Sequence, residues 1–313
     1  MLQYLIILLD DTSVSYCHYE NTKTVRKLIS LDDLKAGIFF AMKQNLMIQF
    51  VYPDDELPQE YHTLIESIDH QRIMPASHAA ADAEVIVFDR MDKIPETLTG
   101  LGTNAVYVVR VMKNELFHEI EKIVALLEKA DRINVALTDV ETFTDADFTA
   151  YRQALSQLAE AVTVQYSRNH FPQLNILTDR VLLDRMNNCN AGVENITLAP
   201  NGKFYICPAF YDENGQDDVG NPAEGVKMRN RQLYRLDFAP LCRRCDAYQC
   251  RRCVWLNRKT TLEINTPSHE QCVVAHLERN ASREWLKKVS DRFPEKEIAE
   301  IQYLDPFEVI EKF

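Results

Sequence analysis

Four cysteines crowd into one short stretch, Cys242-Arg-Arg-Cys245-Asp-Ala-Tyr-Gln-Cys250-Arg-Arg-Cys253. Three more flank it along the chain, at Cys189, Cys207 and Cys272. The eighth cysteine, Cys17, stands alone near the beginning. Thiols gathered in this way favour disulfides in an oxidising compartment and metal in a reducing one. The compartment therefore has to be considered first.

The charge, the apolar runs and the opening residues are those expected of a protein in a reducing compartment. The 313 residues include 35 Lys and Arg and 47 Asp and Glu, which gives a formal charge of −12. This negative charge disfavours binding to nucleic acid over a wide surface. No apolar run approaches the ~18 residues that a membrane span needs. The opening Met1–Asp10 lacks the cationic start of a signal peptide and predicts a buried strand. We expect a cytoplasmic protein without membrane contact, in which the cysteines bind metal.

The first region, residues 1–180, alternates apolar runs with helical patterns. The runs are Tyr4–Leu9, Leu46–Tyr52, Glu84–Phe88, Ala105–Val111, Ile133–Leu137 and Val162–Tyr166. Their nearly continuous apolar character is typical of strands buried on both faces of a parallel sheet. Ser30 with Asp33, and Thr144 with Asp147, stand where helix caps and first-turn acids belong. The order predicts an α/β fold, a partial (β/α)6 barrel.

One glycine-containing string raises the alternative of a dinucleotide site. Gly100-Leu-Gly102 precedes the predicted strand at Ala105, whereas a pyrophosphate loop follows a strand and opens a helix. A simple turn is the better interpretation.

A hairpin opens the cysteine-rich region. Ile196–Leu198, a Pro-Asn-Gly202 turn and Lys203–Ile206 predict two antiparallel strands. Because Cys189 and Cys207 stand at the outer ends of this hairpin, we expect them to lie close together.

Two metal sites compete as explanations. A single zinc on the four cysteines of the 242–253 stretch needs CxxC pairs that face each other, and zinc proteins usually separate such pairs by ~15–20 residues. Only four residues separate them here. Seven cysteines fit two iron–sulfur clusters better, because interleaved ligands from one run are found in two-cluster ferredoxins. Zinc remains the alternative.

The cysteine order over residues 189–272 resembles the SPASM domain of radical S-adenosylmethionine (AdoMet) enzymes. The resemblance rests on Cys189, on Gly202 separated by four residues from Cys207, on the CxxC at Cys242, and on a distant Cys272. It implies two [4Fe-4S] clusters, whose ligands are Cys189, Cys207 and Cys253 for the first and Cys242, Cys245, Cys250 and Cys272 for the second. The first cluster then has one position that is open or held by a residue other than cysteine.

The first region resembles the partial barrel of the same enzymes but departs from it at the reactive loop. Their CxxxCxxC motif, which holds the AdoMet-cleaving cluster, corresponds here to Asp10, Val14 and Cys17. The glycine-rich turn after the second strand is replaced by Pro53–Pro58. The resemblance therefore implies a degenerate barrel that does not use AdoMet. Within this group the layout is most similar to the CXXX repeat peptide maturases.

Several neighbouring residues have two interpretations. His269 and His276 flank Cys272, and either could complete the first cluster or donate a hydrogen bond to a ligand. Cys17 beside His18 resembles a thiol–imidazole pair, but a buried remnant that binds no iron is the better prediction. The basic residues near the cysteines are expected to offset the charge of the clusters, with a nucleic-acid patch as the alternative; these residues are Arg243, Arg244, Arg251, Arg252, Arg258 and Lys259.

The expected organisation follows from these predictions. Residues 1–180 form the radical SAM-like α/β domain, 181–290 a small α+β SPASM-type iron–sulfur domain, and 291–313 a helical tail. The expected function is in ribosomal peptide modification, as a peptide maturase or as the substrate-binding partner of a separate, active radical SAM enzyme. The expected partner is a precursor peptide. Whether the chain is itself an enzyme stays open, and a zinc adaptor that contacts protein or nucleic acid is the alternative.

Overall fold

The computed structural model of the protein describes residues 2–79, 83–95, 104–213 and 215–290. In these residues the strands are β1 Tyr4–Leu8, β2 Met47–Val51, β3 Gln71–Pro75, β4 Val85–Phe88, β5 Val106–Val111, β6 Arg132–Leu137, β7 Gln173–Leu174, β8 Asn195–Leu198, β9 Phe204–Tyr205, β10 Gly220–Asn221 and β11 Gly225–Val226. The helices are α1 Leu31–Gln44, α2 Gln59–Ile65, α3 Lys113–His118, α4 Ile120–Leu127, α5 Asp145–Ser167, α6 Asp179–Leu182, α7 Pro208–Glu213, α8 Val254–Thr261 and α9 His269–Ser290.

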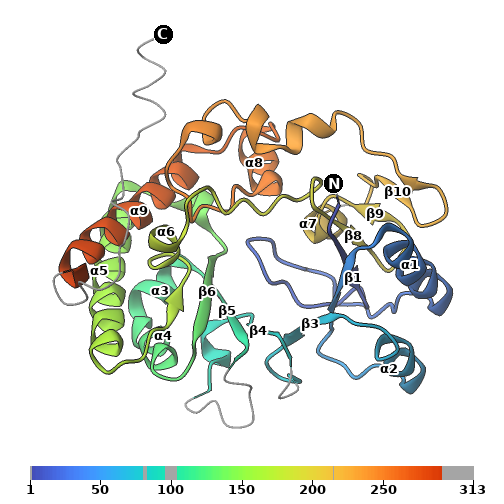
Figure 1. The fold of residues 1–313 in the computed structure, drawn as a ribbon, viewed down its shortest axis with the longest axis horizontal. Coiled ribbons are helices and arrows are strands. Elements are labelled where there is room, and N and C mark those ends of the chain that lie inside the picture. The colour runs from blue at the N-terminus through green and yellow to red at the C-terminus, as the bar shows by residue number, and fades with distance from the viewer. Residues whose placement is uncertain (1, 80–82, 96–103, 214, 291–313) are drawn as a thin grey trace.

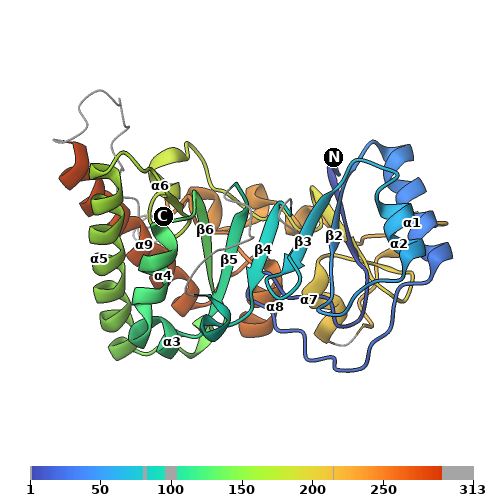
Figure 2. The same cartoon turned by 90° about the horizontal axis from the view of Figure 1, so that it is seen from below.

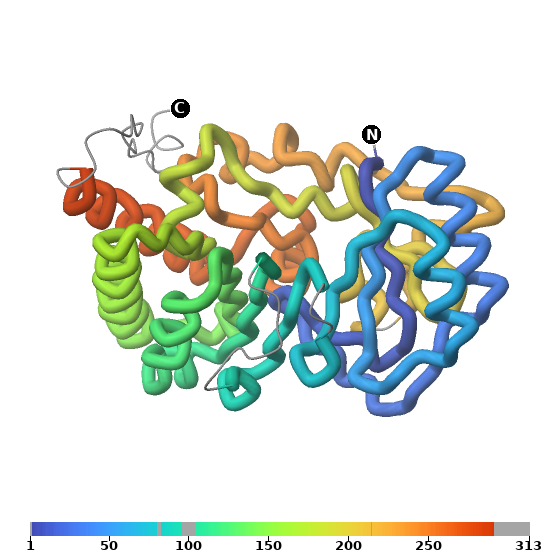
Figure 3. Tube along the Cα trace, turned by 60° about the horizontal axis from the view of Figure 1, so that its bottom comes forward, coloured from blue at the N-terminus to red at the C-terminus, as the bar shows by residue number. Residues whose placement is uncertain are grey.

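Most strands belong to one sheet with the order β7-β6-β5-β4-β3-β2-β1-β8-β9. All neighbours pair in parallel except β8 and β9, which form an antiparallel hairpin. Figure 1 shows the strands as an open arc, with α1 to α5 on its outer side. The chain after α6 crosses the open side of the arc, and Figure 3 shows α9 running beside α5. The predicted α/β class with a partial, open barrel is confirmed.

The hairpin joins the cysteine-rich region to the barrel. Asn195 pairs with Tyr4 at the start of β1, so β8 extends the barrel sheet. Gly202 in the hairpin turn has φ +76°, a left-handed conformation that favours glycine. A Cβ on Gly202 would also lie 2.7 Å from Asp33 of α1, so a side chain there would clash. The predicted hairpin is confirmed.

Local signals placed several elements correctly. The Ser30 side chain caps α1 by accepting from the Asp33 N–H at 3.1 Å. The Asp147 carboxylate accepts from the Thr144 N–H at 2.8 Å at the start of α5. Five of the six predicted strands correspond to β1, β2, β4, β5 and β6.

The sixth predicted strand is wrong, and four strands, β3, β7, β10 and β11, were not predicted. Val162–Tyr166 lies in α5, because it continues the helical spacing of Tyr151, Leu155 and Leu158 and so extends one buried face. The longest of the missed strands is β3, Gln-Arg-Ile-Met-Pro, in which only Ile73 and Pro75 are buried. The polar residues of β3 interrupt the apolar pattern by which the other strands of the sheet were predicted.

Two predictions fall on residues outside those described: the turn at Gly100–Gly102 and the helical tail at 291–313. The domain boundaries stay a prediction. Among the described residues, no helix has the length and apolar character to cross a membrane.

Candidate metal centres

The seven clustered cysteines divide into two groups. Four of them line one hollow beside α9; we call Cys242, Cys245, Cys250 and Cys272 the second cysteine group. The volume of this hollow is about 30 Å³, above the ~10–15 Å³ that one water-sized group needs. The hollow can therefore hold at least one small group beside the four cysteines.

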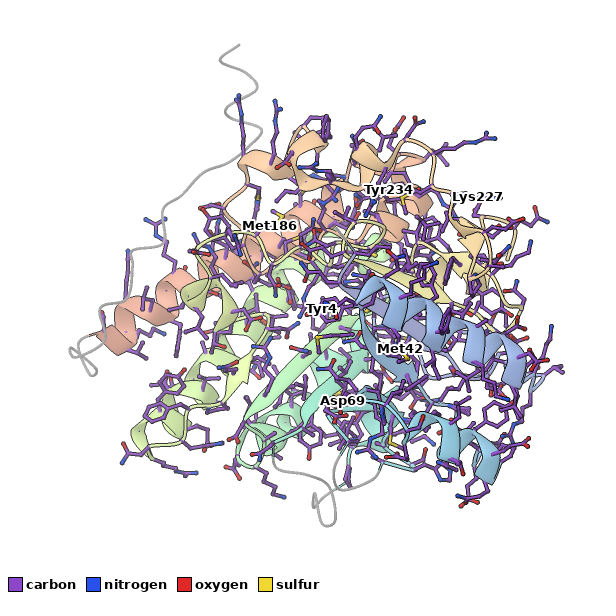
Figure 4. All side chains as sticks on the ribbon, turned by 45° about the vertical axis from the view of Figure 1, so that its right-hand side comes forward. Tyr4, Met42, Asp69, Met186, Lys227 and Tyr234 are labelled. Atoms are coloured by element: carbon purple, nitrogen blue, oxygen red, sulfur yellow. The ribbon has the colours of Figure 1, made fainter. Side chains whose placement is uncertain are left out.

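Met186 also lines this hollow, from the chain segment that follows α6. Figure 4 labels Met186 on the side of the molecule that residues 181–290 occupy, away from Asp69 before β3. The hollow is therefore built within the cysteine-rich region.

Burial favours the protonated form of two thiols of the second group, Cys242 and Cys250. It raises the pKa of Cys242 to about 11 and that of Cys250 well above the ordinary value. A coordinated metal reverses this preference, because its positive charge deprotonates the thiol that binds it. The group is thus built for coordination more than for free thiolate chemistry.

The remaining three, Cys189, Cys207 and Cys253, form the first cysteine group. Burial raises the pKa of Cys207 well above its ordinary value, and the neighbouring Cys253 and Cys189 raise it further. Burial and then Cys189 raise the pKa of Cys253 to about 12. Thiols that perturb one another in this way lie close together, so the structure brings Cys189 and Cys207 together as the hairpin predicted.

Backbone N–H groups donate to sulfur in both groups. The Ala247 N–H lies 3.4 Å from the Cys245 Sγ, and the Leu256 N–H lies 3.5 Å from the Cys253 Sγ. Ala191 and Ala209 donate in the same way to Cys189 and Cys207. Such hydrogen bonds stabilise thiolates and set the potential of iron–sulfur clusters.

Arg252 lies between the two cysteine groups. Its side chain is buried, and its pKa is lowered by burial and raised by Cys242 and Cys250 of the second group and by Cys189 and Cys253 of the first. Its Nη1 has no hydrogen-bond partner in the described structure. A buried guanidinium nitrogen without an acceptor costs free energy. An anionic, thiolate-ligated cluster on either side would supply the acceptor. The sequence marked Arg252 only as one of several basic residues.

The two candidate histidines lie in different surroundings. His276 lines the hollow, with its Nε2 3.5 Å from the Cys245 Sγ, and one turn of α9 places it beside Cys272. His269 is exposed at the start of α9 and meets the ring of Phe148 at 6.4 Å. His276 therefore accompanies the second group, and the first group is not completed by it.

The loop after β1 is held by hydrogen bonds at the degenerate ligand positions. One oxygen of the Asp10 carboxylate accepts from the Thr12 N–H and hydroxyl, both at 2.8 Å, and the other pairs with Arg26 at 3.2 Å. Val14 is buried, and its N–H donates to the Tyr52 carbonyl. Asp10 and Val14 are thus structural in this loop.

Cys17 differs from the prediction of a buried remnant, because its side chain is exposed. Burial of its surroundings nevertheless raises its pKa to about 12, and the next largest influence is Cys189. The side chain of Cys17 therefore has solvent-accessible surface, although the protein around it disfavours the thiolate. Figure 1 shows the segment between β1 and α1 within the arc of strands.

The basic residues after Cys253 are engaged in ion pairs. Arg258 pairs with Glu213 and Asp217 at 2.7 and 2.6 Å, and Lys259 pairs with Glu141 at 2.5 Å. Trp255, the nearby ring that could stack on a base, is buried. These contacts favour a structural and charge-compensating role for this part of the basic stretch.

The residues fit clusters better than one zinc ion. A zinc on the 242–253 stretch requires its four thiolates around one point at about 2.3 Å, yet Cys253 belongs to the first group and the other three to the second. Across the described ranges, no three His, Cys, Asp or Glu side chains are placed to hold a single metal ion. The unpartnered Arg252 nitrogen agrees with an anionic group beside it.

The architecture is that of the radical SAM-like α/β proteins. In particular, it is similar to native anSMEcpe with bound AdoMet, a SPASM-domain radical SAM maturase, with 13% identity, a TM-score of 0.62, and coverage of 92% of this chain and 99% of that one. The same protein with AdoMet and the Cp18Cys peptide matches with 12% identity, a TM-score of 0.62, and coverage of 93% and 100%. Streptococcus suis SuiB bound to precursor peptide SuiA overlaps with 13% identity, a TM-score of 0.43, and coverage of 75% and 64%.

No family model matches the chain, and no curated protein sequence matches it significantly. At such low identity the structural likeness establishes the fold. The resemblance to radical SAM-like proteins is confirmed as a likeness of fold.

Proposed function

We propose that the protein is an iron–sulfur protein of a ribosomal peptide modification system. The observation that carries the proposal is the division of seven cysteines into two groups, each with the membership that the SPASM resemblance implies. The second group would hold one [4Fe-4S] cluster with four thiolates, and the first group would hold another with three. When bound, such clusters supply one-electron transfer at potentials that the surrounding protein sets.

The peptide substrate is proposed from the fold and from its neighbours. A solved neighbour with the same fold is described with a bound peptide, and it covers nearly the whole chain. We place the proposed peptide on the open side of the arc, which residues 181–290 cross. The layout of the cysteines resembles that of the CXXX repeat peptide maturases, and we propose a cytoplasmic setting, which suits oxygen-sensitive clusters.

The β1 loop supports a substrate-binding role beside a separate radical SAM enzyme. Asp10 is engaged with Thr12 and Arg26, and Val14 offers no ligand atom. Soft iron–sulfur sites prefer thiolate. The barrel would then bind and present a precursor peptide without cleaving AdoMet.

The test is the metal content of anaerobically purified protein. We expect about eight iron and about eight acid-labile sulfide per chain, from two four-iron clusters with cysteine ligands. Stoichiometric zinc without sulfide would overturn the proposal and favour the adaptor. Co-purification with a Cys-repeat peptide, compared with a scrambled peptide of equal charge, tests the substrate class separately.

A further inference from the structure

The first cysteine group is one ligand short. A [4Fe-4S] cluster has four irons, and full protein ligation takes four thiolates. Cys189, Cys207 and Cys253 supply three. The sequence leaves the fourth position open, and His276 lies with the other group.

A further thiol comes near this group from the other end of the chain. Cys189 lies close enough to Cys17 to raise the pKa of the Cys17 thiol. Cys17 likewise raises the pKa of Cys207 and of Cys253. All three members of the first group therefore have Cys17 as a neighbour. The side chain of Cys17 is exposed, so it is not enclosed by packing of its own loop.

Specific contacts hold the Cys17 loop at this place. Arg110 of β5 donates from Nε to the Cys17 carbonyl at 3.1 Å and from Nη2 to the Tyr19 carbonyl at 2.6 Å. Downstream, the Lys23 ammonium lies 3.4 Å from Asp212 and 3.1 Å above the ring of Tyr211.

Both partners of Lys23 belong to α7, which begins directly after Cys207. Figure 2 shows this loop at the same end of the sheet as α7 and α8. The loop is thus fixed against the helix that follows a member of the first group.

We propose that Cys17 is the fourth protein ligand of the iron–sulfur cluster held by Cys189, Cys207 and Cys253. The inference rests on the proposed function, because it requires that this group binds a cluster. On coordination the Cys17 thiol gives its proton to solvent and an iron–sulfur bond forms. Arg251 and Arg110 face Cys17 and favour its thiolate.

His18 is the nearest competitor for this position. Its Nδ1 lies 2.7 Å from the Leu137 carbonyl, which assigns the proton to Nδ1 and leaves the Nε2 lone pair available. Cys17 is preferred because thiolate is the softer ligand and because three thiolates already define the site.

This ligand changes what the cluster can do. With Cys17 bound, every iron has a protein ligand and none is left open for a small molecule. The loop that would have held an AdoMet-cleaving cluster instead completes the neighbouring one.

The experiment compares Cys17→Ala and Cys17→Ser with His18→Ala in anaerobically reconstituted full-length protein. Iron, sulfide and electron paramagnetic resonance (EPR) spectra are measured after mild oxidation, with and without added imidazole. Cys17→Ser keeps the size of the side chain and tests the ligand in a protein that folds. Circular dichroism spectra verify the fold of each variant.

We expect Cys17→Ala to lose about one iron per chain as a three-thiolate cubane opens, or about four if the cluster is lost. Its oxidised spectrum should show a three-iron cluster, and that of Cys17→Ser an altered cluster signal. Imidazole should change the spectrum of Cys17→Ala and leave wild type unchanged.

Iron content and spectra in both Cys17 variants equal to wild type, in a protein with about eight iron, would overturn this inference and leave the two-cluster proposal standing. The same changes in His18→Ala alone would assign the ligand to the imidazole and also overturn it. A wild-type protein without iron would overturn both proposals.

Discussion

The loop after β1 and the cysteine-rich segment after β7 occupy one fold but have opposite chemical character. In the loop, two of three ligand positions carry Asp10 and Val14, which are fixed by hydrogen bonds to neighbouring protein. In the segment, all seven cysteines fall into two groups beside buried positive charge. The same arc of strands thus carries a loop fixed by hydrogen bonds and a segment in which the proposed ligands lie in two groups.

The largest effect is expected in the second cysteine group. Replacing Cys242, Cys245, Cys250 or Cys272 by Ala should remove about four of about eight iron per chain, because each is a proposed ligand of one cluster. Solubility should fall in parallel, since metal binding contributes to folding of the region that holds it. Metal analysis and the soluble fraction after anaerobic expression measure both effects.

Met186→Leu is the matched control, because Met186 lines the same hollow without a thiol. It should retain the iron of wild type. Equal iron loss in this variant would mean that packing of the hollow, and not coordination, determines the iron content.

The next largest effect concerns the charge between the two groups. Arg252→Gln should lower the reduction potential of at least one cluster by roughly 60 mV, a tenfold change for a one-electron couple. The reason is that a buried guanidinium offsets the negative charge gained on reduction. A redox titration followed by EPR measures the potential, and iron content should stay unchanged.

Arg243→Gln serves as the comparison, because Arg243 is exposed. A potential unaltered in Arg252→Gln, or lowered equally in both variants, would contradict the placement of Arg252 between the clusters.

Some features of the site depend only on residues that are close together in the sequence. The hairpin, the cysteine spacing and the caps at Ser30 and Thr144 follow from neighbouring residues, and all were predictable. The approach of Cys17 to Cys189 was not, because contacts of the loop with β5, β6 and α7 create it.

The errors in the fold have the same origin. Val162–Tyr166 has the composition of a strand, but the buried face of α5 includes it. The polar strand β3 is defined by its neighbours β2 and β4, with which it pairs in parallel. In both places tertiary packing overrides local preference.

A smaller effect should follow from breaking the contact that joins the two regions. Burial raises the pKa of Asp212 to about 7, and Lys23 opposes that rise. An acid whose pKa is higher in the folded state stabilises the protein at low pH, and this stability is lost as the pH rises through the folded pKa. Lys23→Met should therefore cost about 1–3 kcal/mol at pH 8, the range for hydrogen bonds to charged groups, and less at pH 6.

Denaturant unfolding at both pH values, under anaerobic conditions, measures this difference. Lys27→Met is the matched control, because Lys27 is an exposed lysine of the same loop. Asp212→Asn should remove the part of the pH dependence that this carboxyl contributes. A loss in Lys23→Met that is equal at pH 6 and pH 8 would show that the ionisation of Asp212 is not involved.

The smallest expected effect is the absence of a product. AdoMet cleavage needs a cluster with three thiolates and one open iron. The loop offers only Cys17 as a thiol, because Asp10 is engaged with Thr12 and Arg26 and Val14 has no ligand atom. If Cys17 completes the first cluster, that cluster has no open iron either. The purified protein, incubated anaerobically with dithionite and AdoMet, should therefore release no 5′-deoxyadenosine above a no-enzyme control, as chromatography would measure.

Cys17→Ala opens an iron on the first cluster but does not rebuild the three-thiolate loop, so it should also release no 5′-deoxyadenosine. A time-dependent deoxyadenosine peak in wild type that disappears in Cys17→Ala would show that the loop generates radicals. The division between the two regions would then be wrong.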